Sequence, residues 1–293
     1  IVGINAGTST SDLAFVTEHS NTKAEKMRIT SEGYVGIGTS SPTATLDVNG
    51  TIKLDGNYPT GTRNVALGNT ALDSPSLTGN ENTAIGHEAL TSNTSGAANT
   101  ALGRSGLAAN TTGSYNSAVG FNSLGANTTG ASNSALSSEV LQANTTGSNN
   151  TGVGRQALSS NTTAGNNTAV GYYSLKANTT GGENVAFGES ALSSNTTASN
   201  NTAVGKSSLA ANTTGADNVA IGRDALLLNT TASNNSAIGR HSLGSNTTGT
   251  FNVAVGNYTL DANTTGNYNT AVGYASLSAN TTGELNVSLG ASS

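Results

Sequence analysis

The sequence predicts an all-β protein whose larger part is a parallel β-solenoid. A 17-residue unit, close to N-T-A-V-G-x-x-S/A-L-x-A/S-N-T-T-G-x-x, repeats without a break from Asn82 to the end of the 293-residue chain. Repeats of such lengths stack on their neighbours into elongated rods. The unit is too short for a helical hairpin, and its glycine and β-branched residues disfavour helix. We therefore expect two short strands and two turns in each coil.

Residues 1–56 lack the repeat and carry a denser charge, and they predict a small N-terminal β region. Runs of strand-forming residues separated by polar stretches indicate short strands. The Asn49-Gly50 pair between two such runs also indicates a hairpin. The expected strands cover residues 13–17, 26–30, 45–48 and 51–54.

Residues 57–63 are expected to be a linker, and residues 64–293 to form the repeat shaft. The unit that opens at Asn64 is one residue longer than the others. We number each unit from its opening asparagine, which is repeat position 0. About fourteen coils, stacked about 4.8 Å apart, predict a rod of roughly 65–70 Å. All three prolines lie before residue 76, which suits an uninterrupted ladder after it.

The apolar positions of the repeat predict its core. Position 8 is leucine in every unit, and we expect these leucines to fill the coil interior. Position 2 is alanine except at Gly152 and Ser288, whereas position 3 is always large and apolar. Adjacent strand residues point to opposite faces. If both faces are buried, one meets the core and the other a neighbouring chain, although the alanine could also be a tolerated surface residue. The sparse core and the small residue at position 2 together favour an oligomer.

Two segments of the chain resemble known fibre proteins. The unit N-T-A-V-G…L…N-T-T-G is similar to repeats of phage tail fibres and bacterial trimeric adhesive fibres, and it resembles a lengthened form of the N-S-V-A-I-G repeat of YadA-type adhesin heads. The stretch from Met27 to Gly50 resembles a segment common in long tail-fibre proteins. The resemblance implies a left-handed β-roll in a homotrimer, located on a virion or at the cell surface, with other fibre or tail segments as partners.

The function expected from the sequence is that of a non-enzymatic fibre shaft that presents a receptor-binding tip. We interpret the chain, which begins at Ile1 and stops within a unit, as a fragment of a longer fibre. One alternative is an adhesin whose side binds host or prey surface glycans. A second alternative is an ice-binding solenoid that uses the regular array of threonines. This alternative is weaker, because we expect the Thr-Thr pair in a turn rather than on a flat strand. Phage and bacterial origins both remain open.

Aromatic side chains at variable repeat positions are the candidate ligand contacts, because exposed rings can stack on sugars. The competing interpretation, which we favour, is that these positions vary freely because packing does not restrict them. The candidate contact residues are Phe121, Tyr172, Tyr173, Tyr258 and Tyr274.

No catalytic, cofactor or metal site is predicted. His19, His87 and His241 lie far apart, and we expect the latter two to be solvated surface residues. The Gly36-Ile37-Gly38 run lacks the third glycine of a dinucleotide motif. A net charge of −5 with 9% charged residues argues against a nucleic-acid partner. No apolar run approaches the ~20 residues that membrane insertion requires.

Asn-Thr-Thr occurs eleven times at the 17-residue period. Each copy is formally an N-glycosylation sequon. The alternative is a turn in which the asparagine caps the backbone and stacks on its equivalent in the next coil. We favour the turn, and the sequence leaves glycosylation open.

Overall fold

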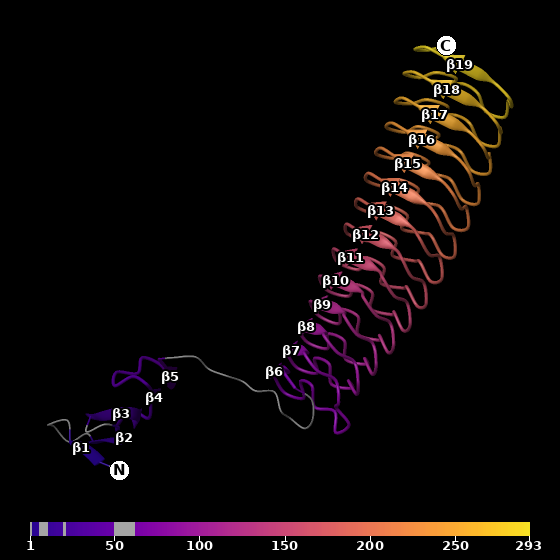
Figure 1. The fold of residues 1–293 in the computed structure, drawn as a ribbon. Coiled ribbons are helices and arrows are strands. Elements are labelled where there is room, and N and C mark those ends of the chain that lie inside the picture. Colours follow the sequence, from indigo (N-terminus) through magenta and orange to yellow (C-terminus); the bar gives the residue numbers. More distant parts are fainter. Residues whose placement is uncertain (1, 6–10, 20–21, 50–61) are drawn as a thin grey trace. The chain divides into compact units, whose positions relative to one another are not determined.

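The computed structural model describes residues 2–5, 11–19, 22–49 and 62–293 (Figure 1). The chain divides into two compact units, Ile1–Leu54 and Asp55–Ser293, which are described separately. The predicted linker at 57–63 lies outside the described residues except for its last two. The described residues form strands, turns and bends, which confirms the predicted all-β class.

The N-terminal unit is a five-stranded sheet in the order β1-β2-β3-β4-β5. Neighbouring strands from β1 to β4 are antiparallel, and β5 pairs with β4 in parallel. The strands predicted near 13–17, 26–30 and 45–48 are present, while the expected strand at 51–54 lies outside the described residues. The strands are β1 (Val2–Asn5), β2 (Ser11–His19), β3 (Thr22–Ile29), β4 (Val35–Ile37) and β5 (Leu46–Val48).

An arginine links the two longest strands of this sheet. The Arg28 guanidinium on β3 donates to Asp12 Oδ2 on β2 at 2.9 Å and to both Glu25 carboxylate oxygens at 2.8 Å. The hydrogen bonds from Arg28 hold the pKa of Glu25 below its ordinary value, although burial opposes them. Planar two-point pairing of this kind fixes the geometry of the side chains.

The second compact unit contains a parallel β-solenoid, as predicted. Its fourteen strands form one sheet in strict chain order, and from β7 on each strand residue lies beside the residue 17 positions later. The strands are β6 (Val65–Leu67), β7 (Thr83–Ile85), β8 (Thr100–Leu102), β9 (Ser117–Val119), β10 (Ser134–Leu136), β11 (Thr151–Val153), β12 (Thr168–Val170), β13 (Val185–Phe187), β14 (Thr202–Val204), β15 (Val219–Ile221), β16 (Ser236–Ile238), β17 (Val253–Val255), β18 (Thr270–Val272) and β19 (Val287–Leu289).

Each coil contains one strand rather than the two that we expected. The rest of each coil consists of turns, because the residues at repeat positions 6, 8 and 16 adopt left-handed backbone conformation in coil after coil. Examples are Tyr173, Leu175 and Glu183, with φ of 60°, 49° and 60°. The residue after the strand also has positive φ, 142° at Gly188, which glycine adopts without strain. These turns interrupt extended geometry and close the coil within 17 residues.

The turns are nevertheless hydrogen-bonded from coil to coil. Thr111 N donates to Thr128 O at 2.9 Å, Leu107 N to Ser123 O at 3.1 Å, and Tyr115 N to Ala97 O at 3.0 Å. The ladder therefore continues around the coil beyond the three strand residues. Buried backbone groups are paired in this way without a second strand.

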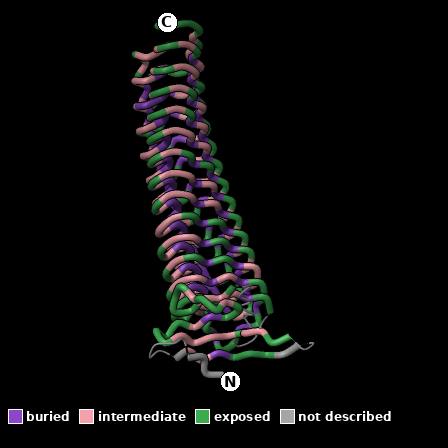
Figure 2. Tube along the Cα trace, turned by 90° about the vertical axis from the view of Figure 1, so that its left-hand side faces the viewer, coloured by how far each residue is buried: buried purple, intermediate pink, exposed green. Residues whose placement is uncertain are grey.

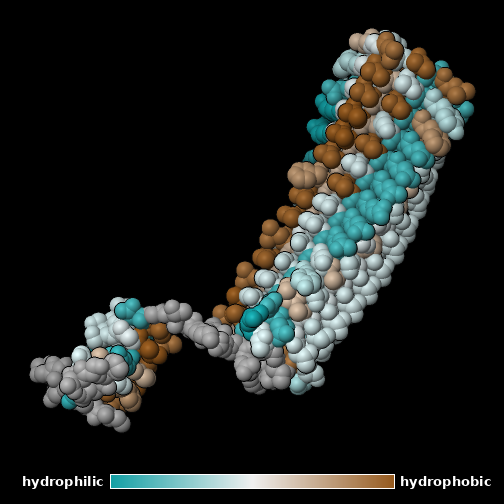
Figure 3. All heavy atoms as spheres, in the orientation of Figure 1, coloured by the Kyte–Doolittle hydropathy of each residue, from teal (hydrophilic) through white to brown (hydrophobic). Residues whose placement is uncertain are grey.

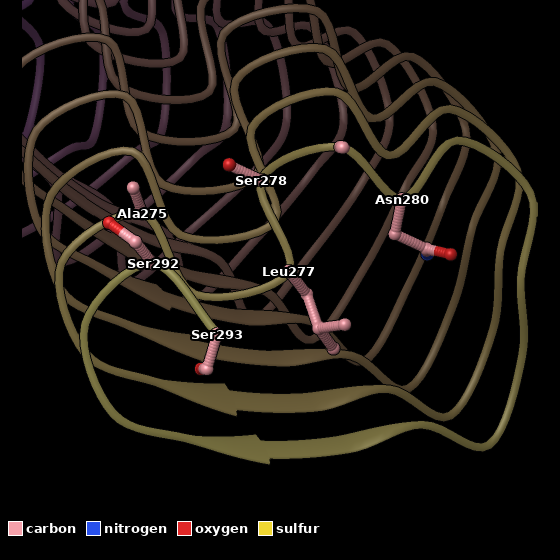
Figure 4. A pocket seen from close by; sticks show the side chains of 7 residues that line it. Ala275, Leu277, Ser278, Asn280, Ser292 and Ser293 are labelled. Carbon is pink, nitrogen blue, oxygen red and sulfur yellow. The ribbon is translucent and has the colours of Figure 1, made fainter.

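The interior of the rod is a narrow column of leucine and alanine. The position-8 leucines from Leu72 to Leu260 are at most 1% exposed, which confirms the prediction. Figure 2 shows the buried residues running along the rod, and Figure 4 shows the Leu277 side chain directed into the last coil. From Ala84 on, the alanines at position 2 are also buried, at 0–2% exposure, whereas Ala66 in the first coil is exposed. The interpretation of position 2 as a surface or intersubunit position is therefore wrong.

The alanines face inward because the interior beside position 2 has room for little more than a methyl group. One pair of neighbouring coils, in which a larger residue faces a glycine, illustrates this limit. Val140 is the one valine at position 7, where most units have serine or alanine, and it is fully buried. Position 2 of the following coil is Gly152, where an added Cβ would lie 2.4 Å from Val140 Cγ1. Glycine thus provides the space that the larger valine requires.

This exchange predicts a pair of coupled substitutions. Gly152→Ala should lower the melting temperature, because overpacking a tight core costs ~1–3 kcal/mol. Adding Val140→Ala to Gly152→Ala should restore most of the loss by removing the clash. Circular dichroism melts of both variants and of Val140→Ala alone measure the coupling. Equal melting temperatures for Gly152→Ala and the parent chain would contradict this packing.

Candidate functional site

The Asn-Thr-Thr asparagines form a buried ladder along the rod. Asn178 is 0% exposed, and its Nδ2 donates to Asn161 Oδ1 and to Gly181 O, both at 2.9 Å. Its Oδ1 accepts from Asn195 Nδ2 at 2.9 Å. Both amide protons are used inside the coil, so a glycan on this nitrogen is incompatible with the fold. The turn-and-ladder interpretation is confirmed.

A second asparagine row, at repeat position 0, runs beside the first. Asn184 Oδ1 accepts from the backbone N of Asn201 at 3.0 Å. Asn184 and Asn195 both donate to the carbonyl of Ala198, at 2.9 and 3.0 Å. The two rows thus converge on the carbonyl at position 14. Among the described residues, no buried side-chain nitrogen or oxygen lacks a hydrogen-bond partner.

The ladder predicts a large difference between two neighbouring polar residues. Asn178→Ala should destabilise the rod, because it orphans buried groups at about 1–3 kcal/mol each. The matched control is Thr180→Ala, which alters an exposed residue of the same turn and should change stability little. Thermal melts by circular dichroism measure both. Similar melting temperatures for the two variants would contradict a stabilising role for the ladder.

The strands present an apolar surface to solvent, which we call the outer strand face. It consists of the side chains at positions 1 and 3 of the fourteen coils, from Val65 and Leu67 to Val287 and Leu289. Leu102, Leu136 and Phe187 are 45%, 50% and 57% exposed. Figure 3 shows a hydrophobic band that runs along one side of the rod. Exposed apolar patches of such extent mark interaction surfaces.

Charged groups avoid this face entirely. None of its positions holds Lys, Arg, Asp or Glu, and from Asn82 on these residues occupy only positions 5, 6, 9, 15 and 16. The centres of protein interfaces are likewise depleted in charge. The sequence predicts the large apolar residues at position 3 but not the side of the strand to which they point.

The candidate aromatic residues lie in three separate places along the rod. Phe121 lies below the Arg104 guanidinium, 5.7 Å from ring centre to Cζ. Tyr172 and Tyr173 stack on each other with centroids 3.8 Å apart. Tyr258 and Tyr274, on adjacent coils, meet edge to face at 6.3 Å. The five residues therefore do not form one site.

The Tyr172–Tyr173 pair is largely satisfied within itself. One face of each ring is covered by the other ring. The Lys176 ammonium lies 4.0 Å from the centroid of the Tyr173 ring. A hydrogen bond between the hydroxyls raises the pKa of Tyr172 and lowers that of Tyr173. This self-pairing leaves less ring surface for a ligand.

Tyr258 belongs to a denser surface group. The Arg240 guanidinium lies 5.3 Å and the His241 ring 5.9 Å from the Tyr258 ring centroid. His241 Nδ1 is hydrogen-bonded to the Asp261 carboxylate. A ring beside charged planar groups suits a sugar, whose hydroxyls need hydrogen bonds while its C–H face needs an apolar surface. We call Arg240, His241, Tyr258, Asp261 and Tyr274 the tyrosine cluster.

The histidines otherwise give no site. His87 Nδ1 lies 3.5 Å from Glu88 Oε2 with its side chain 45% exposed, which agrees with a surface residue. His241, with its side chain 32% exposed, also lies at the surface, where it pairs with Asp261 of the neighbouring coil. Nowhere in the described residues do three metal-ligating side chains gather. The same residues include no helix long and apolar enough to cross a membrane.

A hollow of about 350 Å³ lies at the coil around β19. It is lined by Ala275, Leu277, Ser278, Ala279, Asn280, Ser292 and Ser293. Figure 4 shows how these side chains lie on that coil. We assign it no ligand.

Comparison with known proteins gives no further guide to function: no protein-family model, curated protein or solved structure matches this chain.

Proposed function

We propose that this chain is the structural shaft of a homotrimeric fibre on a virion or cell surface, and that the shaft presents a receptor-binding tip. The observation that carries the proposal is the uninterrupted register of fourteen strands, supported by asparagine rows inside the rod. Each coil is fixed to its neighbours all around its circumference. Such a stack resists bending and holds its ends at a set separation, as a spacer must.

The distribution of constant and variable residues supports a shaft. The constant leucines and asparagines point into the rod, where they maintain packing, and the positions that carry charged and most aromatic residues lie outside. A binding surface built from repeats would be expected to repeat its contact residues, whereas the aromatic residues here are scattered. The uncharged outer strand face supports association with further copies and with other fibre or tail segments. The proposal assigns the chain no enzymatic activity.

A second candidate function is binding of surface glycans by the side of the rod. The observation in its favour is the tyrosine cluster, where two exposed or half-buried rings lie beside an arginine and a carboxylate. Ice binding through the Thr-Thr pairs is weaker. These threonines lie on bends, and one hydroxyl of each pair is engaged, as Thr111 Oγ1 donates to Thr128 O at 3.1 Å.

The shaft proposal predicts that attachment tolerates changes along the rod. Two variants of the full-length fibre, carried by its parent particle or cell, test it. The first replaces Tyr172, Tyr173, Tyr258 and Tyr274 by serine, and the second deletes residues 82–115, two whole units. Attachment should persist in both, because neither touches the tip. The deletion should shorten the fibre by ~9.6 Å in electron micrographs, since coils stack at about 4.8 Å.

The control is the parent fibre, compared in the same attachment assay and by native mass measurement. Loss of attachment after the tyrosine changes, with the fibre still assembled, would favour the glycan-binding alternative. A native mass equal to that of one chain would contradict the proposed homotrimer.

A further inference from the structure

The outer strand face carries a second, longer period. From β12 to β19, position 1 alternates between a hydroxyl residue and valine, so the pattern repeats every 34 residues. The alternating residues are Thr168, Val185, Thr202, Val219, Ser236, Val253, Thr270 and Val287. In the coils from Thr83 to Thr168, position 1 is threonine or serine throughout. The interior does not require this alternation, because position 1 points outward.

Phe187 is a single landmark on the same face. It is the one aromatic residue among the side chains at positions 1 and 3, and it is 57% exposed. Val185, on the same strand, is 40% exposed. The strands on either side present Val170 and Val204 at the equivalent position. Phe187 therefore protrudes from a row of smaller aliphatic side chains.

The extent of the face fits a second copy of this chain. Its exposed side chains, at roughly 60–100 Å² each, together offer on the order of 1,000 Å², against about 800 Å² per partner in a standard interface. The face is uncharged and runs along all fourteen strands of the solenoid. A partner that covers it must present a matching apolar row with the same spacing, which another copy does.

We propose that copies of this chain pack through the outer strand face, in parallel and with identical coils at the same height, and that Phe187 and the valine alternation set this register. The proposal rests on the oligomeric fibre proposed above, but it does not depend on the number of copies. It names the contact surface and the residues that determine how the copies align.

Parallel packing follows from the uneven distribution of valine. Val185, Val219, Val253 and Val287 all lie in the half of the rod after β12, whereas the other half has one valine at position 1, Val65 in the first coil. In a parallel pair, the valine-rich half of one copy meets the valine-rich half of the other. An antiparallel pair would set Val185, Val219 and Val253 against threonine and serine hydroxyls, which lose hydrogen bonds to water without apolar gain.

The register follows from the two features acting together. A 17-residue repeat would otherwise allow slippage by one coil, because position 3 is apolar in every coil. Slippage by one coil sets each alternating valine against a hydroxyl residue. Slippage by two coils restores the alternation but moves Phe187 opposite Val153 or Ile221, which leaves a void or a clash. Specificity of this kind penalises the wrong arrangement rather than strengthening the right one.

Register also decides whether the assembly closes. When identical coils meet at one height, a rotation relates the copies and the assembly is finite. A constant slip between successive copies gives a contact that cannot close and therefore propagates. The outer strand face thus needs a device against slippage, and the alternation with Phe187 provides one.

The natural chain has no cysteine, so introduced cysteines report the register directly. Thr202→Cys places a thiol on the outer strand face, and Thr180→Cys is the matched control on an exposed turn. A bis-maleimide with a span of about 10 Å should link most Thr202→Cys chains to each other, because strand faces that pack on each other lie about 10 Å apart, beyond the ~7 Å between Cα atoms that a direct disulfide allows. Thr180→Cys should remain largely unlinked. Native mass and circular dichroism confirm assembly and fold before cross-linking.

A mixed assembly tests the role of Phe187. Chains with Thr202→Cys are refolded together with chains with Ser236→Cys, and the same reagent is added. In register, these two positions are offset by two coils, ~9.6 Å along the rod, in addition to the distance between the two faces. The 202–236 link should be rare with Phe187 in place. Phe187→Val in both chains should raise it several-fold without dissociating the assembly, as measured by mass spectrometry of the linked peptides.

The outcomes separate this inference from the shaft proposal. An assembled fibre that links through Thr180→Cys but not Thr202→Cys would overturn the surface and leave the fibre intact. A fibre in which the 202–236 link is unchanged by Phe187→Val would overturn the role of Phe187. A monomeric parent chain would overturn both proposals.

Discussion

The rest of the rod depends on stacking of asparagine side chains in two buried rows. Each amide bonds to its equivalent in the adjacent coil, so the rows tolerate no drift in coil length. The 18-residue first unit shows where the constraint relaxes. Asn82 N still donates to Asn64 Oδ1 at 2.8 Å, but that unit has Pro75 and the buried Leu77 in the region where later units place the second asparagine. The first unit accommodates its additional residue in the segment where the second asparagine row is absent.

The fixed coil length also determines which residues the inside of the rod accepts and which ones point outward. The interior is so narrow that it selects alanine at one position and leucine at another, and glycine where a neighbour is larger, as at Gly152 beside Val140. Large β-branched residues that would form the core of a wider sheet are instead directed outward. The apolar face of the rod is therefore a consequence of the cross-section of the coil.

The period, the number of coils, the leucine core and the capping role of the Asn-Thr-Thr turn could all be predicted from the sequence, because each leaves a residue at a fixed spacing. The facing of positions 2 and 3 could not, since alternation fixes that two neighbours oppose each other but not which is inside. A second strand was predicted from the length and composition of the unit, yet the residues that follow the first strand adopt turn backbone, with a φ of 49° at Leu175. The pairing of His241 with Asp261 joins variable positions of adjacent coils, which no spacing rule connects.

The longer period on the outer strand face bears on how such a protein changes length over generations. Tandem units of similar sequence are prone to unequal recombination, which adds or removes whole units and leaves the ladder continuous. A change of one unit would reverse the order of valine and hydroxyl coils beyond the junction. A change of two units would preserve it, as residues 168–287 do along their whole course. Within this part of the rod, the sequence of the outer strand face thus repeats every two coils, although the fold repeats every coil.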